Sequence, residues 1–199
     1  MAESQYLFHY TREPDGAWPG ESRGAYLDWL ATGPADDRRD AFAAMKRILE
    51  EGCIQGSGRL MPNRTPMVSF TAASPDEAAK LRRFRPSLHR WDFRPYGLAV
   101  RRDLLENLGA RSVQYLPQTE LKRLNADERS FAQKHEPPQT DWSAEKEWRL
   151  PGDLCLSELP HEAMVVLAPT PDEAQTLAAI LGCRWHVLEN AAQPGKTDG

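Results

Sequence analysis

Apolar and polar residues alternate along several short runs of the chain, and the runs are bounded by glycine, proline or charged residues. Alternation over about four to eight residues is typical of strands that bury one face. The pattern therefore predicts a series of short strands. They are expected at residues 5–11, 67–71, 96–101, 111–117, 145–150, 163–169 and 184–189.

Apolar residues that recur every three or four positions predict helices between these strands. In residues 36–54, the apolar residues from Phe42 to Leu49 recur on one helical face, and Gly52 is expected to end the helix. A serine or threonine followed by proline and acidic residues is a typical helix start, and this pattern occurs at residues 74–77 and 170–173. Further helices are expected at residues 74–84, 118–135 and 170–182.

This order of elements indicates an α+β fold. One helix near the start is followed by short strands with small helices between them, which differs from regular βαβ alternation. No linker is long enough to separate two domains, so residues 1–190 are expected to form a single domain. Residues 191–199 are small and polar and are expected to be a disordered tail.

The composition fits a soluble globular protein, with 40% hydrophobic and 27% charged residues over 199 positions. The formal net charge of −4 excludes a global basic field that would attract nucleic acid. A local basic surface remains possible in residues 80–95, where arginines are interleaved with aromatic residues. Such a segment suits phosphate contacts and base stacking, or it is an ordinary surface segment between two core elements.

The three cysteines are odd in number and far apart in sequence, which argues against a disulfide framework and favours a reducing compartment. The spacings of cysteine and histidine give no zinc signature, so no metal is expected. No apolar run approaches the length of a membrane span, and the start of the chain has no signal-like apolar region. We therefore expect a cytoplasmic protein that does not insert into a membrane.

The stretch "SAEKEWRL" (143–150) carries the most concentrated chemistry. If residues 145–150 form a strand, Glu145, Glu147 and Arg149 share one face, and tryptophan and leucine anchor the other. Paired carboxylates can divide the roles of holding a substrate and acting electrostatically or as a base. The alternative is a half-exposed strand in which Glu147 forms a salt bridge with an arginine.

Two other predicted strands also carry small polar groups on one face. His9 and Thr11 share a face in "FHYT", and Ser69 and Thr71 share a face in "VSFT". Each pair either lies on a wet face or has a binding role, and a lone strand histidine is often structural.

The pieces "FHYT", "RILEEGCI", "VSFT", "YGLAVRRDLL" and "EKEWRL", in this order, resemble the ADP-ribosyltransferase fold. They are similar in particular to the abortive-infection AbiGi-type proteins of phage resistance and toxin–antitoxin systems. The resemblance covers roughly residues 6–150. It implies a split β-sandwich of two small sheets with flanking helices, and NAD bound in the cleft between the sheets.

The resemblance also implies roles for individual residues. Glu147 would hydrogen-bond the ribose next to nicotinamide, and Glu145 would orient the acceptor. A first-strand histidine would hold a ribose, and an S-x-T strand would shape the nicotinamide side. The implied cofactor-binding residues are His9, Tyr10, Thr11, Ser69 and Thr71.

The resulting hypothesis is an NAD-dependent mono-ADP-ribosyltransferase that acts as a toxin or phage-defence effector. NAD would be its substrate, a protein or nucleic acid its acceptor, and a cognate toxin or antitoxin its partner. Cleavage of the ribose–nicotinamide bond develops an oxocarbenium-like cation that a fixed carboxylate stabilises. The alternatives are a catalytically inactive binding module on the same fold, with an antitoxin or immunity role, and a nucleic-acid-binding domain that uses residues 80–95.

Overall fold

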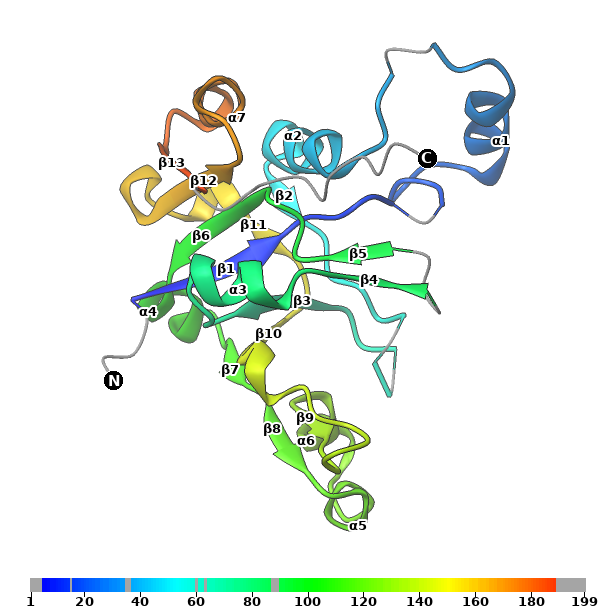
Figure 1. Ribbon diagram of the computed structural model, residues 1–199, viewed down its shortest axis with the longest axis vertical. Coiled ribbons are helices and arrows are strands. Elements are labelled where there is room, and N and C mark those ends of the chain that lie inside the picture. Colours follow the sequence, from blue (N-terminus) through cyan, green and yellow to red (C-terminus); the bar gives the residue numbers. More distant parts are fainter. Residues whose placement is uncertain are drawn as a thin grey trace, which may run out of the picture.

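The computed structural model describes residues 5–14, 16–34, 37–59, 61–62, 64–86 and 90–188 (Figure 1). Its centre is a seven-stranded mixed sheet with the strand order β13-β12-β6-β1-β3-β10-β7. The pair β12–β13 is parallel, and the other neighbours are antiparallel. The strands are β1 (Tyr6–Tyr10), β3 (Met67–Thr71), β6 (Gly97–Arg101), β7 (Arg111–Ser112), β10 (Glu147–Pro151), β12 (Met164–Ala168) and β13 (Arg184–Val187).

Three two-stranded sheets surround this central sheet. They are β2 (Cys53–Ile54) with β11 (Leu154–Cys155), β4 (Arg83–Arg85) with β5 (Arg90–Asp92), and β8 (Gln114–Leu116) with β9 (Ala132–Lys134). Together with the helices, they confirm the predicted α+β class. The predicted tail, residues 191–199, lies outside the described residues.

The helices are short, and two of them form a layer on the central sheet. Figure 1 shows α2 and α7 close together on one side, whereas α1 stands apart from the sheet. The α-helices are α1 (Arg23–Thr32), α2 (Ala41–Glu51), α3 (Pro75–Leu81), α4 (Arg102–Asn107), α5 (Gln118–Leu121), α6 (Ala126–Ser130) and α7 (Pro171–Leu181). The 3-10 turns are η2 (Ser143–Glu145), η3 (Leu156–Glu158) and η4 (His161–Ala163). None of the helices described is long and apolar enough to cross a membrane.

The predicted helix signals correspond to real caps. Gly52 ends α2 in the left-handed conformation, with φ of 63°, and its N–H donates to the carbonyl of Leu49. Ser74 and Glu77 form a capping box at the start of α3. This helix ends at Leu81 rather than at residue 84, because Arg82 has extended backbone angles and the chain enters the β4–β5 hairpin.

The larger core lies between the central sheet and the layer of α2 and α7. Alternate residues of β1, β3 and β10 face this core, among them Leu7, Phe70 and Trp148. A smaller apolar cluster covers the opposite face around Phe8 and Leu167. The intervening residues include Ser69 and Thr71 of β3 and Glu147 of β10, so these polar side chains point away from the larger core.

Three further predicted elements differ from the structure. The strand expected at residues 145–150 begins at Glu147, because Lys146 has φ of 44° and Glu145 ends the preceding 3-10 turn. The expected helix at 118–135 is divided into α5, α6 and β9. The expected strand at 111–117 is interrupted at Val113, where the chain leaves the central sheet and pairs with β9.

Candidate functional site

The three strands that carry the predicted site residues are neighbours in the central sheet. Thr71 of β3 lies opposite Phe8 of β1 on one side and opposite Glu147 of β10 on the other. The β3–β10 ladder has five residue pairs, whereas β1 and β3 are paired at Phe8 and Thr71 alone. The ladder between β1 and β3 therefore stops next to His9.

His9 bonds across the point where this ladder stops. Its Nδ1 donates to the carbonyl of Ser69 at 2.9 Å, and its ring meets Phe70 edge-on at 5.8 Å between centroids. Burial lowers the pKa of His9 to about 4; the bond to Ser69 opposes this shift, and the charge of Arg12 adds to it. The ring is therefore neutral at pH 7 with its proton on Nδ1, which leaves Nε2 as an acceptor.

Ser69 connects this histidine to Glu147. Its backbone carbonyl accepts from His9, and its hydroxyl donates to Oε1 of Glu147 at 3.2 Å. Ser69 thus links His9 and Glu147 across three adjacent strands, through its carbonyl on one side and its hydroxyl on the other. The ring of His9 packs against Phe70, which faces the larger core, whereas the Ser69 hydroxyl and Glu147 point away from that core.

Arg149 fixes the carboxylate of Glu147. Only 3% of Arg149 is exposed, and its Nε and Nη2 donate to the two carboxylate oxygens at 2.9 and 3.0 Å. Its Nη1 donates to the carbonyl of Ser130 at 2.7 Å, and its Nη2 also donates to Gln133 at 3.1 Å. The salt bridge that the sequence offered as an alternative is therefore present within β10. The hydrogen bonds from Arg149 to Ser130 and Gln133 tie β10 to the segment around β9.

The backbone of Glu147 is held by hydrogen bonds to Val113 and Tyr115. Its N–H donates to the hydroxyl of Tyr115 at 2.9 Å, and its carbonyl accepts from Val113 at 2.8 Å. Burial raises the pKa of Tyr115 to about 12, so this phenol stays protonated. We use "carboxylate site" for five residues: His9, Ser69, Tyr115, Glu147 and Arg149.

The carboxylate of Glu147 retains room for one further donor. Described residues give it three hydrogen bonds, two to Oε1 and one to Oε2. A carboxylate has roughly four lone-pair positions. The Glu147 side chain is 18% exposed, and Oε2 accepts a single hydrogen bond from the described residues.

Glu145 does not share a strand face with Glu147, and this corrects the sequence-based expectation. The left-handed Lys146 turns Glu145 toward the β4–β5 hairpin, where Arg85 lies at 2.9 Å and Arg83 at 3.8 Å. Burial raises the pKa of Glu145, while the charge of Arg85 lowers it. The two glutamates are therefore neighbours with separate arginine partners.

Two threonines predicted to bind cofactor have internal partners instead. Thr11 is buried and donates to the carbonyls of Ala41 and Tyr96 at 2.8 and 3.3 Å. Thr71 is also buried; it donates to the carbonyl of Glu145 at 2.5 Å and accepts from the N–H of Ala73. Both hydroxyls shape the backbone around the site and are not directed to a ligand.

Tyr10 lies in a different environment. It lines a pocket of about 290 Å³ together with residues of α3, Arg82, Phe93 and Leu188, whereas Glu147 is not among the lining residues. Among the described residues, the hydroxyl of Tyr10 is buried without a hydrogen-bond partner. We call this cavity the Tyr10 pocket.

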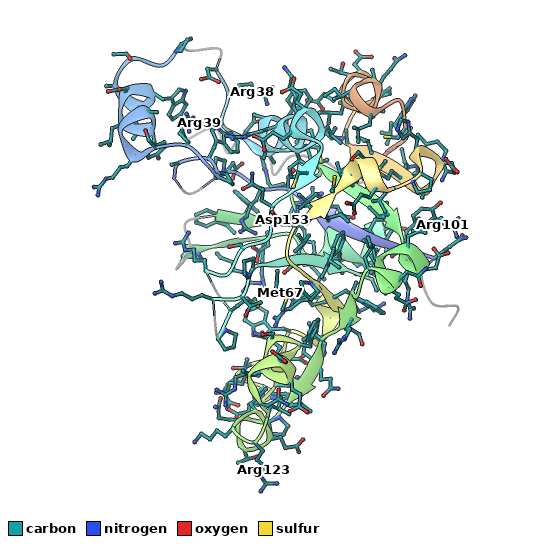
Figure 2. The ribbon with its side chains drawn as sticks, turned by 180° about the vertical axis from the view of Figure 1, so that it is seen from behind. Arg38, Arg39, Met67, Arg101, Arg123 and Asp153 are labelled. Atoms are coloured by element: carbon teal, nitrogen blue, oxygen red, sulfur yellow. The ribbon has the colours of Figure 1, made fainter. Side chains whose placement is uncertain are left out.

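The alternation of "EWR" had placed Arg149 on the face of Glu147, and the structure agrees. Tyr115 and Gln133 carried no such signal, because they come from a segment whose turns were not predicted. Figure 2 shows Arg123 at the far tip of that segment, away from Met67 at the start of β3.

Within the described ranges, no group of three or more acidic, histidine or cysteine side chains is placed to hold a metal ion.

Comparisons with protein-family models, with curated proteins and with solved structures find no match to this chain.

Proposed function

We propose that this protein binds NAD and cleaves its ribose–nicotinamide bond as a mono-ADP-ribosyltransferase. The observation that carries the proposal is the hydrogen-bonded line from His9 through Ser69 to Glu147. It joins the histidine strand, the S-x-T strand and the glutamate strand, which carry three of the five sequence pieces on which the resemblance depends. The strands are sequence-distant but adjacent in the sheet.

The break between β1 and β3 supports the finer description of the fold. On one side of the single pair Phe8–Thr71 lie β1, β6, β12 and β13, and on the other lie β3, β10 and β7. We propose that these two groups of strands correspond to the two small sheets of a split β-sandwich. NAD would then lie near the point where they separate.

The geometry suits stabilisation of a developing positive charge. Glu147 is a fixed carboxylate because Arg149 holds both of its oxygens. As the bond from the ribose carbon to the nicotinamide nitrogen breaks, nicotinamide leaves with the bonding electrons and the ribose carbon becomes cationic. A carboxylate that needs no reorientation stabilises this state more than the ground state. The acceptor then bonds to the same carbon and loses a proton.

His9 would contribute orientation rather than acid–base chemistry. Its neutral ring, with the proton on Nδ1, presents Nε2 as an acceptor for a ribose hydroxyl. A ring whose pKa lies near 4 is a poor proton acceptor at pH 7, so its use is to hold the sugar. The proposal includes a toxin or phage-defence role in the cytoplasm, with a protein or nucleic-acid acceptor and a cognate partner protein.

A second candidate function is binding of single-stranded nucleic acid through the β4–β5 hairpin. The Arg83 side chain is 53% exposed, and Phe84 is 45% exposed and packs against Trp91. Exposed cations next to aromatic rings favour phosphates and stacked bases. Binding of a labelled oligonucleotide that weakens with salt and with Arg83→Ala would support this function.

The test of the main proposal is nicotinamide release from NAD by the purified protein, with and without cell lysate as a source of acceptor. Release that rises with lysate supports a transferase, and release without it supports hydrolysis at the same site. Binding of NAD without release indicates the inactive binding module. If NAD neither binds nor reacts, the proposal is wrong, and the oligonucleotide assay decides the second candidate.

A further inference from the structure

Two cysteines that are 102 positions apart in the chain lie opposite each other in the small β2–β11 sheet. Cys53 of β2 is the register partner of Cys155 of β11, and this ladder is antiparallel. Directly opposite residues of an antiparallel pair point to the same face of the sheet. Both cysteines are free and half-buried.

The hydrogen-bonding pattern identifies the type of this pair. The N–H of Leu156 donates to the carbonyl of Gly52 at 2.8 Å, and these two residues are the next position along the ladder. Hydrogen-bonded and non-hydrogen-bonded positions alternate in antiparallel sheets, so Cys53 and Cys155 occupy a non-hydrogen-bonded position. The alpha carbons at such positions are about 4.5 Å apart, near the short end of the range that disulfides span.

We infer that Cys53 and Cys155 are a site of reversible oxidation, at which a disulfide donor such as oxidised glutathione forms a cross-strand disulfide. This inference does not depend on the proposed function. It changes what the sequence alone indicated, because three scattered cysteines gave no reason to pair any two of them.

The reaction proceeds by thiol–disulfide exchange. One protein thiolate attacks glutathione disulfide, which forms a mixed disulfide and releases one glutathione. The second protein thiolate then attacks the protein sulfur of that mixed disulfide and releases the other glutathione. The protein loses two protons and two electrons, and glutathione disulfide is reduced by the same two electrons.

The surroundings favour a slow and reversible reaction. Burial raises the pKa of Cys53, and the nearby charge of Asp153 raises it further, so little thiolate is present at neutral pH. The Sγ of Cys155 lies 3.0 Å from the hydroxyl of Ser157. Because a short cross-strand bridge is less relaxed than an average disulfide, it is expected to be readily reduced.

The disulfide would join the segment that follows α2 to the segment that follows β10. β2 directly follows α2, and β11 follows β10, the strand that carries Glu147, after a turn at Gly152 and Asp153. Asp153 already joins these parts, because its carboxylate accepts from the N–H of Gly56 at 2.7 Å. A disulfide at Cys53 and Cys155 would close a long loop and restrict the unfolded chain.

The experiment is to incubate the purified full chain with oxidised glutathione and then to count free thiols and map the disulfide-linked peptides. We expect two of the three cysteine thiols to disappear, a peptide that links Cys53 to Cys155, and a mass loss of about 2 Da. The melting temperature should rise by on the order of 10 °C and return on reduction. The reaction should be faster at higher pH.

Cys183 provides the matched control, since it lies outside this sheet and burial also raises its pKa. Cys183→Ser should form the disulfide normally, whereas Cys53→Ser and Cys155→Ser should not. The melting temperatures of the reduced variants show whether either substitution disturbs folding. A bond to Cys183, a bond between two molecules, or a stable glutathione adduct in the unsubstituted protein would each overturn the inference.

Discussion

The carboxylate site and the Tyr10 pocket differ in a way that matters for function. In the carboxylate site, Arg149 donates from all three of its nitrogens, and the oxygens of Glu147 are oriented by protein groups. In the Tyr10 pocket there is a cavity, and a buried hydroxyl has no partner among the described residues. The carboxylate site has a carboxylate of fixed orientation, whereas the Tyr10 pocket has a cavity of about 290 Å³.

One helix contacts both regions. Glu77 of α3 pairs with Lys146, the residue before Glu147, at 2.8 Å. Asp76 and Ala79 of the same helix line the Tyr10 pocket. The comparison therefore contrasts a region whose polar atoms are already paired with a region that has an open cavity. Substitutions in each region, followed by measurements of unfolding, test this contrast.

The largest expected effect is on the buried ion pair. Arg149→Leu leaves the Glu147 carboxylate without its partner, and this should lower the free energy of unfolding by about 3–5 kcal/mol. Urea unfolding followed by circular dichroism measures the change. The matched control is Arg101→Leu, because Arg101 pairs with Asp103 two residues away at the exposed surface. This exposed pair should contribute little to stability, and an equal loss in the two variants would contradict a special role for Arg149.

The next effect concerns pH and His9. The pKa of His9 is about 4 in the folded protein and 6.5 ordinarily, so below pH 6.5 the unfolded chain binds a proton that the folded protein does not. Its contribution to stability is complete above pH 6.5 and falls as the pH drops toward 4, by at most about 3 kcal/mol.

Urea unfolding at pH 5 and pH 7 tests this dependence. His9→Gln should show a smaller loss of stability between the two values than the unsubstituted protein. The control is His186, which is exposed on β13, and His186→Gln should leave the pH dependence unchanged. If His9→Gln has the same dependence as the unsubstituted protein, the histidine is not held neutral by burial.

The smallest expected effects distinguish the two regions through a pair of tyrosines. Tyr115→Phe removes the acceptor of the Glu147 N–H and should cost about 1 kcal/mol. Tyr10→Phe removes a buried hydroxyl without a described partner, and should leave stability unchanged or raise it by up to about 1 kcal/mol. Thermal unfolding of both variants checks the contrast. A loss in Tyr10→Phe as large as that in Tyr115→Phe would show that Tyr10 already has a partner.

Much of the sheet could be predicted from the alternation of residues. Residues 67–71 form β3 as expected, and Gly52 ends α2 because glycine adopts the left-handed conformation easily. The course of residues 143–147 could not be predicted, because Lys146 is left-handed without being a glycine. That one conformation separates Glu145 from Glu147.

The hydrogen-bond partners of the proposed site residues were harder to predict than their strands. The resemblance groups His9, Ser69 and Glu147 in one site, and in the structure their strands are adjacent and Ser69 bonds to both of the others. Thr11 was grouped with His9 by alternation alone, but β1 ends at Tyr10 and the hydroxyl of Thr11 bonds to α2. Such a contact depends on how a helix packs on a strand, which no local pattern encodes.

The helix α1 shows the limit of periodicity. None of its residues is buried, and large apolar residues such as Leu27 and Leu30 stay exposed. A helix without a buried face leaves no regular apolar stripe to detect.

The most direct test of the central claim is the rate of nicotinamide release by Glu147→Gln and Glu145→Gln beside the unsubstituted protein. Both substitutions remove one negative charge without changing side-chain size. We predict that Glu147→Gln lowers the rate by about 100-fold or more while NAD still binds. Glu145→Gln should retain most NAD cleavage, because this carboxylate faces Arg85 rather than Ser69. Equal rates for Glu147→Gln and the unsubstituted protein would contradict the claim that Glu147 is the catalytic carboxylate.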